Sequence, residues 1–282
     1  MARKLRDQGL YETRREHDAC GIGAVVNISG QRDHNIIKHA RNIIENLHHR
    51  GAAGADESTG DGAGILFQIP DEFLRSECNR AGTRLPQAGK YAVGMVFGSK
   101  EKELRKKCDE ILSQSLAKYG MKVLHWRDVP VEPDCLGELA REAEPNIKQV
   151  FVDGCGLEGE EFERKLYLAR RRAENKVAKT FGEKGDDFYV TSLSAKTINY
   201  KGMFFAWQLF SYYPDLAEED LLSALAVVHQ RYSTNTLPNW KLAQPFRCLA
   251  HNGEINTLSG NRNHMRARQT KMSSPLFGND FK

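Results

Sequence analysis

The sequence predicts an α+β fold in which strands and helices form separate layers. Short apolar runs have the character of buried strands, and longer segments carry apolar residues at helical spacing. Along the 282 residues, the expected strands come in clusters before the helices. This order favours a layered α+β arrangement. The hydrophobic content of 40% and charged content of 28% are typical of a globular domain.

The first half of the chain is expected to contain strands, two amphipathic helices and two glycine-containing loops. Pro70 ends the second strand and Pro130 follows the fourth. In order, the elements are a strand at 20–28, a helix at 36–47, loops at 49–54 and 59–64, strands at 65–69 and 91–97, a helix at 101–119 and a strand at 122–126.

The second half is expected to begin with a strand at 149–152 and a long charged helix at 160–181, whose charges are interpreted as a solvated face. Further buried segments follow, and the last two are short strands that run into polar loops. These segments are a strand at 188–193, a buried element at 201–210, and strands at 225–229 and 248–251.

Composition excludes several classes of function. The net charge of +4, without a long block of one sign, does not favour nucleic-acid binding. No apolar run is long enough to span a membrane. The segment 1–19 mixes basic and acidic residues and lacks an apolar centre, so it fits neither a secretory signal nor a transit peptide. These observations predict a cytoplasmic protein.

The six cysteines form no C-x-x-C pair, so no zinc ribbon, redox dithiol or other metal site is expected. Cys20 differs from the other five, because it stands at the head of an apolar run and is followed by Gly21 and Gly23. Cleavage before Cys20 would place an α-amine, with a pKa near ~8, beside the thiol. Nucleophile and base would then belong to one residue. The alternative is a small buried core cysteine.

Three polar clusters accompany Cys20. In His229–Thr236, Arg231 at the end of an apolar strand is suited to hold a carboxylate by two parallel hydrogen bonds, or else forms a surface ion pair. In His251–Asn256, the side chain of Asn252 and the backbone N–H of Gly253 are suited to an oxyanion hole, although Asn-Gly is also a common turn. The glycine-rich segment 59–64 is interpreted as a tight turn where chain packs against chain.

In this order the clusters resemble the class II glutamine amidotransferases, and within that class the glutaminase domain of the glutamate synthase large subunit. The resemblance extends over nearly the whole chain, from about Gly9 onward. Three long runs carry it: His49-Arg50-Gly51-Ala52 through Gly64, Tyr232-Ser233-Thr234-Asn235-Thr236-Leu237-Pro238-Asn239-Trp240, and His251-Asn252-Gly253-Glu254-Ile255-Asn256-Thr257-Leu258 with Gly260-Asn261.

The resemblance implies the four-layer α/β/β/α sandwich of the N-terminal-nucleophile (Ntn) hydrolases. It implies that Cys20 is the nucleophile and attacks the glutamine amide to form a γ-glutamyl thioester. Arg231 would hold the α-carboxylate of glutamine with Thr234 nearby, and Asn252 and Gly253 would form the oxyanion hole. His229 and His251 would be structural, and the 49–51 segment would support the site.

The resemblance also implies a division of the chain and a larger assembly. Residues 1–19 would be a leader that is removed, and residues 20–282 an amidotransferase domain that is incomplete at its C-terminal side. The carboxylate that binds the α-amino group of glutamine in the family would lie in the missing continuation. FMN and an iron–sulfur cluster are expected in a synthase portion outside this chain, and no cofactor is expected within it.

The expected function is therefore the hydrolysis of glutamine to supply ammonia for glutamate formation from 2-oxoglutarate. The expected partners are glutamine, the synthase domain and an electron source, either a small electron-transfer subunit or ferredoxin. The sequence leaves open whether the donor is NADPH, NADH or ferredoxin. Two alternatives are the glutaminase part of a phosphoribosyl-transferring amidotransferase and a catalytically dead regulatory module.

Overall fold

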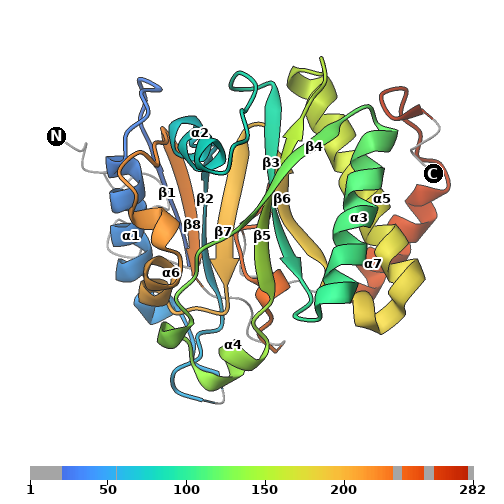
Figure 1. The fold of residues 1–282 in the computed structure, drawn as a ribbon. Coiled ribbons are helices and arrows are strands. Elements are labelled where there is room, and N and C mark those ends of the chain that lie inside the picture. The colour runs from blue at the N-terminus through green and yellow to red at the C-terminus, as the bar shows by residue number, and fades with distance from the viewer. Residues whose placement is uncertain (1–20, 55, 231–236, 251–256, 279–282) are drawn as a thin grey trace, which may run out of the picture.

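Two four-stranded antiparallel sheets form the centre of the structure, a computed structural model that describes residues 21–54, 56–230, 237–250 and 257–278 (Figure 1). The first sheet has the order β1 (Ile22–Val26), β8 (Leu225–Gln230), β2 (Ala63–Gln68) and β7 (Thr197–Gly202). The second has the order β4 (Lys122–Asp128), β5 (Asn146–Asp153), β3 (Tyr91–Gly98) and β6 (Tyr189–Ser194). The expected α+β class is thus confirmed.

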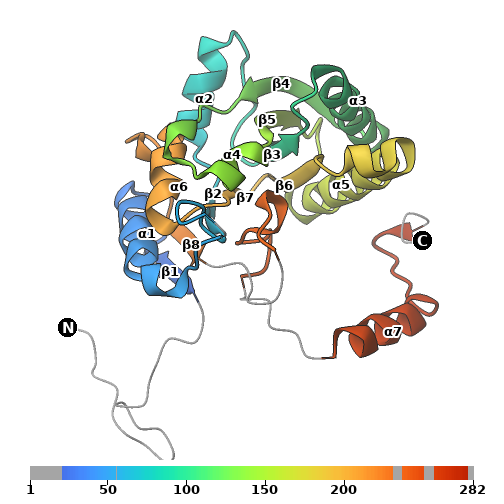
Figure 2. The same ribbon diagram turned by 90° about the horizontal axis from the view of Figure 1, so that it is seen from below.

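Helices cover both sheets, and Figure 1 shows helices, first sheet, second sheet and helices in order from left to right. On the first sheet lie α1 (Asn35–Asn46) and α6 (Ala206–Tyr212), and on the second lie α3 (Lys102–Lys118) and α5 (Gly159–Phe181). The remaining α-helices are α2 (Asp71–Arg80), α4 (Glu138–Glu142) and α7 (Leu258–Gln269). The short 3₁₀ helices are η2 (His48–Arg50), η3 (Pro133–Cys135), η4 (Gly182–Gly185), η5 (Pro214–Ala217) and η6 (Trp240–Leu242). Figure 2 shows α7 apart from the sheets, and none of its residues is buried.

Strand β3 separates two hydrophobic cores because alternate side chains of a strand point to opposite faces. Val93, Met95 and Phe97 enter the larger core, which also contains apolar residues of α1, α2, α6 and the first sheet. Ala92 and Val96 enter the second core, beneath α3 and α5. All residues of β3 are buried, in keeping with its position as one of the two inner strands of the second sheet.

A buried polar network joins the two sheets inside the larger core. The guanidinium of Arg127 on β4 donates to both carboxylate oxygens of Asp215 at 2.8 Å and also contacts Glu77 of α2. The hydroxyl of Tyr200 on β7 donates to Asp215 at 2.9 Å and accepts from the amide of Gln149 on β5. Burial disfavours the charge on Arg127 and by itself would lower the pKa of the guanidinium. The hydrogen bonds to Asp215 and the charge of that carboxylate have the larger combined effect, so the pKa of Arg127 is raised.

Most predicted elements are confirmed, with ends shifted by a few residues, but several regions differ. Helices α2, α4 and α7 were not predicted, because α2 buries only three apolar residues, α4 is five residues long and α7 buries none. The buried element expected at 201–210 is the end of β7, a turn and most of α6. No strand covers 248–250, where the N–H of Phe246 instead donates to the carbonyl of Leu249 in a turn.

The charged face of α5 is not wholly solvated as expected. Arg170 is buried and donates to the carboxylate of Glu174 at 2.8 Å. Its guanidinium also lies 5.2 Å from the ring centre of Tyr167. In the part of the chain that the structure describes, no helix is long and apolar enough to cross a membrane.

Candidate functional site

The described residues bring together the chain on either side of two predicted site residues. Strand β1 begins two residues after Cys20, and β8 ends directly before Arg231. The two strands pair in antiparallel register, with Ile22 opposite His229. Beyond this pair, the N–H of Gln230 donates to the carbonyl of Gly21 at 2.7 Å. The chain neighbours of Cys20 and Arg231 are thus hydrogen-bonded to each other.

Close approach of backbone requires glycine at the first of these positions. A Cβ atom on Gly21 would lie 1.9 Å from the carbonyl oxygen of Gln230, a distance that no side chain tolerates. The glycine after Cys20 therefore allows the beginning of β1 to approach the end of β8.

The 49–51 segment packs against this strand end. A Cβ on Gly51 would lie 2.1 Å from the side-chain nitrogen of Gln230, and one on Gly21 would lie 3.5 Å from the Cβ of Arg50. Two buried polar atoms in this region have no hydrogen-bond partner among the described residues. One is a donor, Nε of Arg50, and the other is an acceptor, Oε1 of Gln230. Gln230 is 1% exposed, and a buried acceptor of this kind normally has a hydrogen-bond partner.

The glycine-rich segment 59–64 that follows is closely packed, as predicted, but it is not a turn throughout, because Ala63 and Gly64 already belong to β2. The N–H of Asp61 donates to the carbonyl of Ala52, and the carboxylate of Asp61 accepts a hydrogen bond from the N–H of Ala52. A Cβ on Gly60 would lie 2.1 Å from the backbone between Phe204 and Phe205. This packing connects the 50–61 region to the segment before α6.

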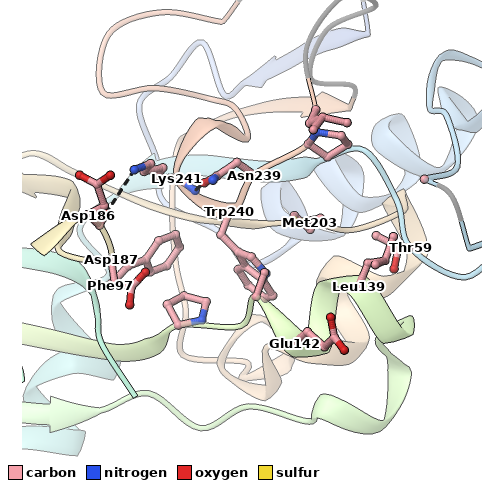
Figure 3. Close-up of a pocket in the computed structure, with 15 residues that line it drawn as sticks. Thr59, Phe97, Leu139, Glu142, Asp186, Asp187, Met203, Asn239, Trp240 and Lys241 are labelled. Atoms are coloured by element: carbon pink, nitrogen blue, oxygen red, sulfur yellow. Dashed lines mark hydrogen bonds between the residues drawn. The ribbon is translucent and has the colours of Figure 1, made fainter. Parts of the chain in front are cut away.

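A pocket of about 530 Å³ lies between this loop, α4 and the chain after residue 236 (Figure 3). Its volume and mainly apolar lining are typical of a small-ligand cavity. Its lining includes three carboxylates, those of Glu142, Asp186 and Asp187, and one lysine, Lys241. Lys241 donates to the carbonyl of Asp186 at 3.2 Å across one side, and Trp240 lies near the centre of Figure 3.

The predicted site residues themselves are not placed by this structure. Cys20, Arg231, Thr234, Asn252 and Gly253 all lie outside the described residues. His229 is fully buried on β8, in keeping with the structural role expected for it. The other five cysteines are free thiols, and burial raises the pKa of Cys78 to about 12, which makes that thiol unreactive.

Sequence reasoning missed two residues that the structure places near the predicted segments. Gln230 was treated only as part of the cluster around Arg231, and Lys201 only as the start of a buried element. Both are at most 1% exposed. A polar residue next to a strongly apolar strand was the available signal for Gln230. No sequence signal distinguishes Lys201 from a surface lysine.

Replacement of Gly21 by alanine is expected to separate the beginning of β1 from the end of β8. The overlap of its Cβ with the Gln230 carbonyl should cost roughly 1–3 kcal/mol of unfolding free energy, measured by urea denaturation. Gly98→Ala is the matched control, because its Cβ would meet only the flexible side chain of Arg105 at 3.3 Å. Equal stability of the two variants would show that this close approach is absent in solution.

Sequence comparisons identify relatives of the chain over nearly its full length. A family described as "Glutamine amidotransferases class-II" matches residues 20–282. The chain is 46% identical to the glutamate synthase [NADPH] large chain of Bacillus subtilis and 44% identical to that of Azospirillum brasilense, over 97% and 98% of its own length. It is 41% identical to ferredoxin-dependent glutamate synthase 2 of Synechocystis over 91% of the chain. The chain spans 18%, 18% and 16% of these relatives.

Proposed function

Because the chain belongs to the class II glutamine amidotransferases, we propose that it is the glutaminase part of a glutamate synthase. The observation that carries the proposal is the hydrogen bond between Gly21 and Gln230, which joins the direct chain neighbours of Cys20 and Arg231. A nucleophile and a carboxylate-binding arginine are the two groups that an enzyme acting on glutamine needs close together. The names of the relatives argue for a glutamate synthase rather than a phosphoribosyl-transferring enzyme.

In the proposed mechanism, residues 1–19 are removed and the α-amine of Cys20 takes the proton of its own thiol. The sulfur attacks the amide carbon of glutamine, and the amine returns the proton to the departing ammonia. Water then hydrolyses the γ-glutamyl thioester, which releases glutamate and restores the thiol. The family match begins at residue 20 and supports Cys20 as the first residue of the working domain.

The other site residues have binding roles in this proposal. Arg231 holds the α-carboxylate of glutamine with Thr234 beside it. The side chain of Asn252 and the N–H of Gly253 stabilise the oxyanion that forms when sulfur attacks. The Oε1 atom of Gln230, buried and without a partner among the described residues, is an acceptor on a side chain that packs against Gly51.

The remaining expectations concern the fold and the larger protein. We infer that the two sheets and their helices belong to the four-layer sandwich of the Ntn hydrolases, supported by the succession of layers in Figure 1. The ammonia would pass to a synthase portion that contains FMN and an iron–sulfur cluster and converts 2-oxoglutarate to glutamate in the cytoplasm. The electrons would come from a small electron-transfer subunit or from ferredoxin.

Replacement of Arg231 by lysine is expected to raise the KM for glutamine at least tenfold. Lysine keeps the charge but loses the two-pronged hydrogen bonding of the guanidinium. The binding free energy of glutamine should therefore weaken by about 1.4 kcal/mol or more. The measurement is ammonia release at varied glutamine concentration. Arg41→Lys is the control, because Arg41 is half exposed on α1, where it pairs with Glu45 and lies over the ring of Phe210. An unchanged KM would return Arg231 to the role of a surface ion pair.

A further inference from the structure

Residues 239–247, here called the connecting segment, join two parts of the chain that carry predicted site residues. The segment follows 231–236, which contains Arg231 and Thr234, and precedes 251–256, which contains Asn252 and Gly253. The position of the connecting segment therefore constrains both of these parts of the chain, one before it and one after it.

Lys201 on β7 holds the middle of the connecting segment. Its side chain is buried, with 1% of the residue exposed. The ammonium donates to the backbone carbonyls of Lys241 at 2.8 Å and Ala243 at 2.7 Å. It also lies 5.0 Å from the ring centre of Tyr189 and 4.7 Å from that of Phe246.

An ammonium in this environment is unusual. No carboxylate of the described chain forms an ion pair with Lys201. Burial, together with the nearby charge of Arg247, lowers its pKa well below that of an exposed lysine. Two carbonyls and two aromatic faces replace the lost water. An apolar side chain would fill the same space without this desolvation, so the lysine is better explained by the two carbonyls that it holds.

Other contacts, with β7, β2 and α4, hold the segment on either side of Lys201. The amide of Asn199, on the same face of β7, donates to the carbonyl of Pro245 at 2.9 Å. The indole of Trp240 donates to the carbonyl of Ala140 at 3.0 Å. Gly64, opposite Lys201 on β2, leaves room for the chain, because a Cβ there would lie 2.5 Å from the carbonyl oxygen of Gln244.

We propose that Lys201 is a positioning residue whose ammonium fixes the connecting segment and thereby places both glutamine-binding parts of the chain. This inference rests on the proposed glutaminase function. Lys201 does not touch the reacting atoms and acts only through the backbone carbonyls of the segment. A purely structural role would make the lysine important for stability but not for the activity of each folded molecule.

The test compares Lys201→Met with Lys148→Met in the protein that contains this chain. Lys148 is the matched control, because it is a partly buried lysine on β5 that pairs with Asp109 and lies 5.6 Å from the ring centre of Trp126. A glutamine analogue with an electrophilic γ-carbon counts the competent sites, so that kcat refers to active molecules. Lys201→Met should lower kcat/KM for glutamine at least tenfold, and Lys148→Met should stay within twofold of the wild type.

Hydrogen exchange supplies a readout that does not need activity. Amides of residues 239–247 should exchange at least tenfold faster in Lys201→Met, while those of β3 keep the wild-type rate. Asn199→Leu should lower kcat/KM and speed the exchange of these amides, as Lys201→Met does. It tests the inference if Lys201→Met does not fold. Asn199→Leu removes the donor to the Pro245 carbonyl, whereas Oδ1 of Asn199 already lacks a partner among the described residues.

The outcomes separate the two proposals. A wild-type protein that releases no ammonia from glutamine would overturn the glutaminase function, and exchange would still decide whether Lys201 holds the segment. An active wild type, with wild-type kcat/KM and exchange in both Lys201→Met and Asn199→Leu, would overturn the positioning role. An equal loss of kcat/KM in Lys148→Met would also overturn it.

Discussion

Replacement of Cys20 by alanine should abolish ammonia release from glutamine, with a loss of roughly 10³-fold or more, because no other group supplies the attacking sulfur. Cys20→Ser should lose nearly as much, since a hydroxyl is a far weaker nucleophile near neutral pH. The measurement is ammonia release by protein that begins at Cys20. Cys155→Ala is the control, because Cys155 is an exposed free thiol and should leave the rate unchanged.

The same preparation tests the proposed base. If the α-amine of Cys20 takes the thiol proton, a peptide bond to Ala19 must inactivate the protein, because an amide nitrogen is not a base. Mass spectrometry of the active protein should therefore show residue 20 as its first residue. Full activity with residues 1–19 still attached would refute the amine-base mechanism.

Replacement of Asp215 by asparagine should lower the free energy of unfolding by about 3 kcal/mol. The substitution keeps the shape of the side chain but leaves the guanidinium of Arg127 without its two-pronged partner, and breaking a buried pair from one side costs roughly 3–5 kcal/mol. The lower end applies because Glu77 still contacts Arg127 at 2.9 Å. Tyr200 also loses a charged acceptor for its hydroxyl.

Urea denaturation of Asp215→Asn and of a surface control measures this effect. Glu45→Gln removes the exposed pair with Arg41 on α1, which should cost less than about 1 kcal/mol. A loss below that value for Asp215→Asn would show that the Arg127 network does not join the two sheets in solution. Arg127→Met together with Asp215→Leu should recover part of the loss, because it removes both charges from the core.

The order and type of most elements could be predicted from the sequence because they depend on local periodicity. Helix α1 shows helical spacing of Ile36, Ile37, Ala40 and Ile44, all of which are buried. Strand β3 is apolar along its whole length and is buried on both faces. Helix α2 lacked a comparable stripe, although the acids Asp71 and Glu72 directly after Pro70 are a helix-start signal that was available.

The sequence by itself determined which residues are chemically suited to act on glutamine and which family the motifs resemble. A cysteine before an apolar strand, an arginine at a strand end and an Asn-Gly pair are recognisable from residue type and order alone. The family match over residues 20–282 confirms the resemblance. The positions of Cys20, Arg231 and Asn252 relative to one another remain a prediction, because all three lie outside the described residues.

Only the tertiary structure decided which distant residues meet. Pairing of β1 with β8 brings Gly21 to Gln230, and the packing of the connecting segment on β7 brings Lys201 to two carbonyls some forty residues away in sequence. Lys201 and Asn199 alternate with Tyr200 along one strand, so they face one side of the sheet while Tyr200 faces the Arg127 network. The physical reason is that a buried polar group is stabilised by its partner, and partners brought together by folding leave no periodic signal in the sequence.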